Sequence, residues 1–255
     1  MNQQESRTIA KPDKPSSGLL AWIACGLAIA CAVAALMAGP LYRLSWLPLG
    51  ICIQIMRWAA TIAMVAAVLG LVAAIMALRA HMRRSLRIAL SGLILALAVA
   101  VPPITLYVRA QNLPRIHDIS TDTENPPPFV AIVPLRQGAP NNTIYTPETA
   151  ALQKKGYPDI KPAILHLAPE KAFERAERAA RSMDWKIVSA SLADLRIEAT
   201  DTTLLFGFKD DIVIHIASHP EGSRVDVRSL SRVGVSDIGV NANRIRRFLA
   251  VLLAD

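Results

Sequence analysis

The second half of this chain lacks cysteine. All three cysteines, Cys25, Cys31 and Cys52, lie in the first 110 residues. Residues 111–255 therefore cannot form a disulfide, and their fold must be stable without one even in an oxidising compartment. The same absence excludes a cysteine nucleophile from this half.

Acidic side chains are scarce in the first half. Residues 1–110 contain 10 basic and 2 acidic side chains, whereas residues 111–255 contain 18 of each, so the net charge of +8 belongs entirely to the first half. A segment that is both apolar and basic is typical of membrane helices with cationic flanks. A nucleic-acid-binding domain needs a positively charged folded surface, so the neutral second half excludes nucleic acid from the expected partners.

Three long runs lack charge altogether, at residues 19–39, 59–78 and 88–108. As helices they would be roughly 30 Å long, which matches the hydrocarbon core of a bilayer. We predict that residues 18–110 form an anchor of three transmembrane helices, the first too long for a cleaved signal peptide. The shorter apolar segment Leu44–Met56 contains Pro48 and Gly50, and is predicted to lie at the membrane interface.

The basic side chains around these runs predict an orientation. One side of the membrane receives the residues before the first run and the connector between the second and third runs, with Arg7, Lys11, Lys14, Arg79, Arg83, Arg84 and Arg87. The other side receives only Arg43, Arg57, Arg109 and Arg115. Because basic loops remain in the cytoplasm, we expect a cytoplasmic tail at 1–17 and residues 111–255 outside the cytoplasm. In a bacterium this describes a multi-pass inner-membrane protein with a periplasmic domain.

Proline is concentrated in one segment. Ten of the seventeen prolines lie between residues 111 and 169. We therefore predict an extended strap over 111–168, leading from the membrane to a folded core. One short helix is expected within it, with Thr146 as the N-cap, Pro147 in the first turn and Gly156 at its end. A further strand is suggested at 163–167.

The remaining residues, 169–255, predict an α+β core. An amphipathic helix over 169–183 is followed by alternating stretches at 185–190, 195–200, 211–216 and 224–230, and then by a helix over 237–253. This order indicates an antiparallel sheet with helices on one face. If the last hairpin turns at Pro220 and Glu221, His215 lies opposite Asp226 and Val213 lies opposite Arg228.

The alternation also separates the two faces of the sheet. One face is aliphatic and must take the helices. The other collects Arg196, Glu198, Asp211, His215, Arg224, Asp226 and Arg228. This charged face is either a solvated surface with cross-strand ion pairs or a polar concavity that holds a ligand.

Several blocks of the second half carry a resemblance to a known family. They are 116–119, Asn125-Pro126-Pro127, 157–160, 197–200, 206–211, 225–229, Ser231-Arg232, Gly234, Asp237, Gly239, 241–242 and 244–245. Over about 113–253 the chain resembles the bacterial and plastid domain-of-unknown-function family 1499. The resemblance implies a membrane-anchored envelope protein and implies no reaction.

Two groups of residues are candidates for ligand binding. Asp210 and Asp211 suggest acid–base or metal chemistry, but neighbours on a strand point to opposite faces. The alternative is that Asp210 ends the preceding turn and Asp211 pairs with Arg228. The second group runs from a loop into a helix N-terminus and suits either an anion or structural locking of that helix: Ser229, Ser231, Arg232, Asp237, Asn241 and Arg244.

Signals for other chemistry are missing. His117, His166, His215 and His219 have no metal-ligand spacing, and neither a phosphate loop nor a nucleophile elbow occurs, so we expect no metal and no cofactor. A non-catalytic binding or scaffolding module of the envelope is therefore favoured, with the bilayer and an envelope protein, lipid or glycan as partners. The alternative is an envelope hydrolase that uses Asp210 or Asp211 with Arg228 and Arg232.

Overall fold

The structure is a computed structural model, and it describes residues 17–254. The chain divides into two compact units after Thr105, and each is described by itself. Of the predicted cytoplasmic tail, 1–17, all but Ser17 lies outside the described residues.

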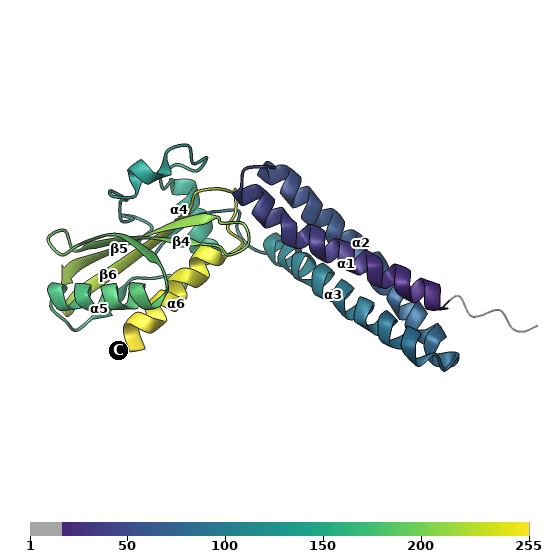
Figure 1. Cartoon of the computed structure of the whole chain (residues 1–255). Helices are drawn as coiled ribbons and strands as arrows, with labels where there is room; N and C mark the ends of the chain where they lie inside the picture. The colour runs from purple at the N-terminus through teal and green to yellow at the C-terminus, as the bar shows by residue number, and fades with distance from the viewer. Residues whose placement is uncertain (1–16, 255) are drawn as a thin grey trace, which may run out of the picture. The chain divides into compact units, whose positions relative to one another are not determined.

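The first unit is built from helices that are long and apolar enough to cross a membrane (Figure 1). They are α1 (Ser17–Arg43), α2 (Leu49–Arg79) and α3 (Arg83–Gln111), the last of which continues into the second unit. The three predicted helices are thus confirmed. The segment predicted separately at Leu44–Met56 is part of α2 from Leu49 onward, and its place at the membrane interface stays a prediction. Pro48 occupies the N-cap of α2, where the backbone N–H makes no hydrogen bond within the helix, so proline is tolerated there. The helix then continues through Gly50.

Small side chains fill the interior of this unit. The buried clusters along the helices consist of alanines with Cys31, while large aliphatic side chains such as Leu36, Val65 and Ile94 are exposed. At Gly92 an added Cβ would lie 2.8 Å from the Cα of Cys25, so the two backbones touch there. Small residues between helices and large ones outside are the packing expected in lipid.

The second unit contains an antiparallel sheet of six strands in the order β1-β6-β5-β4-β3, with β2 also paired to β6. Its strands are β1 (Asp118–Ser120), β2 (Ala163–Leu165), β3 (Lys186–Ser191), β4 (Arg196–Thr202), β5 (Lys209–His219) and β6 (Gly222–Ser231). His215 lies opposite Asp226 and Val213 opposite Arg228, so the predicted register is confirmed. The α+β fold class is confirmed as well.

Two helices cover the aliphatic face of this sheet (Figure 1), namely α5 (Pro169–Ser182) and α6 (Val240–Ala254). Their Phe173, Ala176 and Phe248 pack with Ile214 and Val227 of the central strands. α6 begins three residues later than predicted, because Ile238 and Gly239 have φ angles of 53° and 78° and form a turn before the helix.

The middle of the proline-rich strap, residues 111–168, covers the opposite face of the sheet, while Ile116, Tyr157 and Ile160 nearer its ends pack in the core on the helix face. Besides β1 and β2 it contains the 3-10 helix η1 (Val133–Arg136) and α4 (Pro147–Gly156), whose N-cap Thr146 accepts a hydrogen bond from the Thr149 N–H as predicted. Phe129 and Ile132 of the strap pack on Val213 and Leu230. The charged face is therefore neither a solvated surface nor an open concavity: the strap buries most of it, and Glu198 and Asp211 are only 1% and 0% exposed.

Candidate functional site

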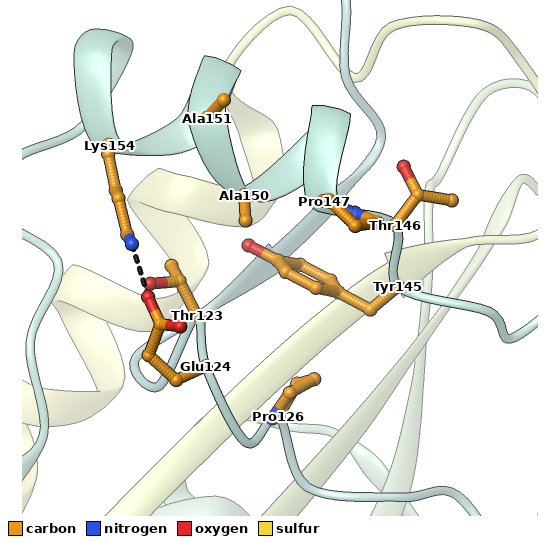
Figure 2. A pocket seen from close by; sticks show the side chains of 9 residues that line it. All are labelled: Thr123, Glu124, Pro126, Tyr145, Thr146, Pro147, Ala150, Ala151 and Lys154. Atoms are coloured by element: carbon orange, nitrogen blue, oxygen red, sulfur yellow. Dashed lines mark hydrogen bonds and ion pairs between the residues drawn. The ribbon is translucent and has the colours of Figure 1, made fainter.

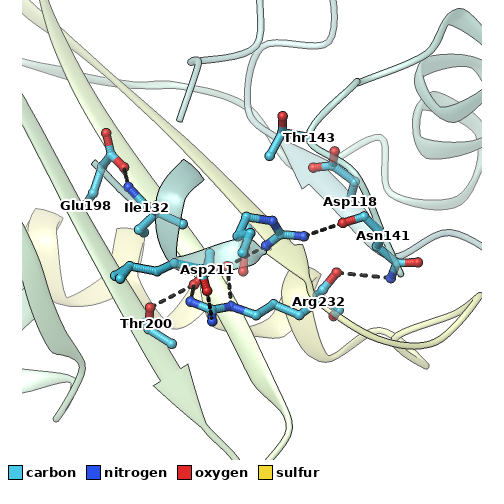
Figure 3. A network of polar contacts seen from close by, with 12 residues as sticks. Asp118, Ile132, Asn141, Thr143, Glu198, Thr200, Asp211 and Arg232 are labelled. Carbon is cyan, nitrogen blue, oxygen red and sulfur yellow. Dashed lines mark hydrogen bonds and ion pairs between the residues drawn. The ribbon is translucent and has the colours of Figure 1, made fainter. Parts of the chain in front are cut away.

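Asp211 is at the centre of a buried polar network on the strap face (Figure 3). Its two carboxylate oxygens accept from Nε and Nη2 of Arg232, both at 2.8 Å, and from the hydroxyl of Thr200 at 2.7 Å. Arg136 of the strap donates to the same carboxylate and, through Nη2, to the carbonyl of Asn141. Two guanidinium groups thus share one carboxylate that has no contact with solvent.

Arg228 forms the second part of this face. Its Nε and Nη2 donate to the two oxygens of Asp118 at 3.0 and 2.7 Å, the parallel geometry that a guanidinium and a carboxylate prefer. The same guanidinium donates to the carbonyls of Pro127 and Thr143. It also lies 5.1 Å from the ring centroid of Phe129 and 5.4 Å from that of Tyr145. The prediction that Asp211 pairs with Arg228 is therefore wrong.

Glu198 attaches the strap to the middle of the sheet. Its carboxylate accepts the backbone N–H groups of Val130, Ala131 and Ile132 at 2.8, 3.1 and 2.8 Å. These donors immediately precede the 3-10 helix η1, where N–H groups have no partner within the helix. A strand carboxylate thus holds the strap in place over the sheet.

The helix face carries a separate polar cluster around Arg244 of α6. Arg244 is 1% exposed, and it donates to Asp210 at 2.7 Å, to Asp201 at 3.0 Å and to the hydroxyl of Ser229 at 3.1 Å. Asn241, one turn earlier, accepts from Ser229 at 2.8 Å, and its amide nitrogen donates to the Ser231 hydroxyl and to the His117 carbonyl.

Asp237 lies just before the N-terminus of α6, where the sequence suggests a bound anion. Its carboxylate accepts the N–H groups of Gly239 at 3.0 Å and Asn241 at 2.5 Å, so the chain itself supplies the negative group at this helix start. Burial raises the pKa of Asp237, while the two backbone hydrogen bonds act in the opposite direction.

The predicted site residues thus separate into two groups. Asp210, Ser229, Ser231, Asn241 and Arg244 meet on the helix face with Asp237 nearby, whereas Asp211, Arg228 and Arg232 lie on the strap face. As the period of two predicts, Asp210 and Asp211 do not converge. Whether any of these residues binds a ligand remains a prediction.

Sequence reasoning missed two of the residues that complete the strap-face network, and it gave no partner to a third. Asp118 and Arg136 lie in the strap, and Glu198 was placed on the charged face without a partner. The only sequence signal for either strap residue was that Asp118 lies in the block 116–119, which carries part of the family resemblance. Within residues 17–254 no group of three His, Cys, Asp or Glu side chains could hold a metal ion.

His215 lies at the less covered end of the same face. It is directly opposite Arg196 on β4 and Asp226 on β6. Burial lowers the pKa of His215, Arg196 lowers it further, and Asp226 opposes both. The neutral imidazole is therefore favoured in the fold.

A pocket of about 350 Å³ opens at the surface of the strap (Figure 2). Its lining residues are Thr123, Glu124, Pro126, Tyr145, Thr146, Pro147, Ala150, Ala151 and Lys154. A second hollow of about 300 Å³ shares Thr123 and Lys154 with the first and continues toward Tyr157 and Lys161. Between them Lys154 forms an exposed ion pair with Glu124.

Buried contacts fix the walls of this pocket. Gln153 of α4 donates to the Ser120 carbonyl at 2.6 Å and accepts from the Ser120 N–H at 2.9 Å, which ties α4 to β1. The Tyr145 hydroxyl donates to the same Gln153 at 2.8 Å. Burial raises the pKa of Tyr145, so it remains a neutral donor.

Together, three helices long and apolar enough to cross a membrane and a strapped, open antiparallel sheet define a membrane-anchored α+β protein. The family model described as "Protein of unknown function (DUF1499)" matches residues 118–252, more than half of the chain, and the chain belongs to this family. The match begins at β1, so it includes the strap as well as the core. A search of curated proteins finds no match.

Proposed function

We propose that this protein is a membrane-anchored, non-catalytic binding module of the bacterial envelope, with residues 111–255 in the periplasm. The orientation is supported by the arginines Arg79, Arg83, Arg84 and Arg87 around the connector between α2 and α3, since basic connectors remain in the cytoplasm. The connector between α1 and α2 has only Arg43 beside it and Arg57 further along α2.

The distribution of the charged side chains favours binding over catalysis. Asp210 and Asp211 are buried, lie on opposite faces, and accept hydrogen bonds from Arg244 and from Arg136 with Arg232. A general base needs a reachable carboxylate beside the reacting group. The hydrolase that would use these aspartates with Arg228 and Arg232 is therefore the less favoured alternative.

The pocket beside Tyr145 carries the proposal. It presents an aromatic ring, prolines and alanines next to a threonine hydroxyl and an exposed Lys154–Glu124 pair. An apolar wall with a few polar groups at its rim is typical of a small-molecule site, and such a wall fits the apolar face of a sugar ring. The ring of Tyr145 is held by Gln153 and Arg228, so little ordering is needed on binding. We therefore propose a saccharide of the envelope as the ligand.

A pocket-filling substitution tests this proposal. The purified full-length protein in detergent is applied to an array of hexoses, N-acetylhexosamines and bacterial envelope glycans, and the strongest hit is titrated by calorimetry. We expect Ala151→Trp to abolish binding, because Ala151 lines the pocket. Lys155→Trp, on the same helix but outside the lining, is the matched control and should bind as the unaltered protein does. The proposal fails if no saccharide binds or if both variants bind equally.

A further inference from the structure

Three loops leave the sheet at the end where the chain enters it from α3. They are residues 203–208 between β4 and β5, residues 232–239 between β6 and α6, and the connector 112–117. Thr202 pairs with Lys209, and Asp210 pairs with Ser231. The connector is fixed to this end by hydrogen bonds from the Ser231 N–H to the His117 carbonyl at 3.0 Å and from the Asp237 N–H to the Ile116 carbonyl at 3.1 Å.

These loops and the first residue of α6 expose large aliphatic side chains at this end of the sheet. We use the name apolar tip for Leu204, Leu205, Val235 and Val240, which are 91%, 36%, 66% and 42% exposed. Several exposed aliphatic side chains at one end of a folded domain are candidates for an interaction surface. Lys209, exposed at the base of the first loop, places a positive charge beside them.

The loop that carries Leu204 and Leu205 has a defined shape. Thr203 and Phe208 close it, since the Thr203 N–H donates to the Phe208 carbonyl at 2.9 Å and the Thr203 hydroxyl accepts the Phe208 N–H at 2.9 Å. The rings of Phe206 and Phe208 stack with centroids 5.1 Å apart. A preformed loop loses little conformational freedom when it meets a partner.

Chain length limits how far this end can be from the bilayer. α3 ends at Gln111, and the carbonyl of Ile116 is already bonded within the domain. Residues 112–116 therefore join the end of a membrane helix to the sheet, and at about 3.3–3.6 Å per residue they reach at most roughly 18 Å. With α3 across a bilayer, this short link keeps the lipid surface within reach of the sheet, which favours lipid over a separate protein as the partner of this end.

We propose that the apolar tip inserts into the interfacial layer of the bilayer that holds α1, α2 and α3, with Lys209 at the level of the phosphates. Aliphatic side chains gain free energy on leaving water for this layer, and a basic side chain is attracted to anionic headgroups. Tip insertion fixes the face that the domain turns toward the membrane. The inference does not depend on the proposed saccharide pocket.

Depth-dependent quenching tests the insertion on the full-length chain. Cys25, Cys31 and Cys52 are replaced by alanine, and one cysteine is introduced as Leu204→Cys or, as the matched control, as Leu192→Cys. Leu192 lies in the turn between β3 and β4, at the opposite end of the sheet, and is 50% exposed. Each protein is labelled with an environment-sensitive fluorophore and reconstituted into vesicles of phosphatidylethanolamine and phosphatidylglycerol.

We expect spin-labelled lipid to quench the label at 204 severalfold more strongly than the label at 192, and aqueous iodide to show the reverse order. Equal lipid quenching at the two positions would overturn the proposal. So would a label at 204 that is shielded from iodide yet not quenched by lipid, because a protein surface would then cover the tip.

Discussion

Single residues in this protein show how buried charge is kept in balance. Asp211 has no solvent exposure, yet it accepts hydrogen bonds from Arg136, Arg232 and Thr200. A buried ion pair contributes little net stability compared with a well-packed apolar pair, but removal of one partner leaves an uncompensated charge. We therefore regard Asp211 as the residue that fixes the strap in register on the sheet.

We expect Asp211→Asn to lower the free energy of unfolding by about 3–5 kcal/mol, because two guanidinium groups lose their shared counter-charge. Glu174→Gln is the control, since its exposed pair with Lys171 is worth at most about 0.5 kcal/mol. Urea unfolding in detergent is followed by the fluorescence of Trp185 after Trp22, Trp46 and Trp58 are changed to Phe. Equal losses for the two variants would show that the Asp211 network is not structural.

The wrong partner predicted for Asp211 has a physical cause. Arg228 was the nearest cation on the adjacent strand, and local pairing rules see only such neighbours. Arg228 instead binds the carboxylate of Asp118, which lies on β1, 110 residues away in the sequence. Contacts between residues so far apart in the sequence depend on the order of the strands in the sheet, and the periodicity within single strands does not predict that order.

At the scale of elements, repeating patterns predicted most of the fold. The strands follow the alternation of apolar and polar residues, α4 follows its cap at Thr146, and α5 follows its apolar stripe. The strap was the exception. Its prolines correctly indicate an extended chain, but they do not show that Phe129 and Ile132 pack on the sheet and turn the charged face into an interior.

Two glycines of the anchor offer a comparison between elements. A Cβ at Gly92 would meet the backbone of Cys25 at 2.8 Å, whereas a Cβ at Gly26 would meet nothing within 4 Å. We expect Gly92→Ala to destabilise the packing of α3 on α1 by about 1–3 kcal/mol. Gly26→Ala should be neutral or slightly stabilising.

Thermal unfolding in detergent measures this difference through a thiol-reactive dye, which reports when the buried Cys31 and Cys52 become accessible. A melting temperature that is lower for Gly92→Ala alone confirms the close helix contact. The same temperature for both variants contradicts it.

The whole molecule combines two opposite packing schemes. The unit built from α1, α2 and α3 has alanine inside and leucine, isoleucine and valine outside, whereas the sheet unit has its large aliphatic and aromatic side chains inside. Each arrangement is stable in one solvent only, the first in lipid and the second in water. The net charge of +8 belongs to the lipid-facing half, so it carries information about membrane topology.

Reporter fusions measure that topology. We expect alkaline phosphatase fused after Asp255 to be active and a fluorescent protein at the same place to be dark, because the phosphatase works only outside the cytoplasm. Fusions truncated at Met82, in the connector between α2 and α3, should give the opposite pair of results. An inactive phosphatase and a bright fluorescent protein after Asp255 would contradict the proposed orientation.

The strap also determines when the domain can finish folding during synthesis. Asp118 leaves the ribosome 110 residues before Arg228, its partner in the finished structure. At about 5–20 residues per second this interval is roughly 5–20 s, during which the strap has no sheet to cover. The last helix, α6, supplies Phe248 and Leu252 to the core and emerges later still. This domain therefore cannot complete its fold until α6 has left the ribosome, and the nascent strap is exposed to chaperones and proteases until then.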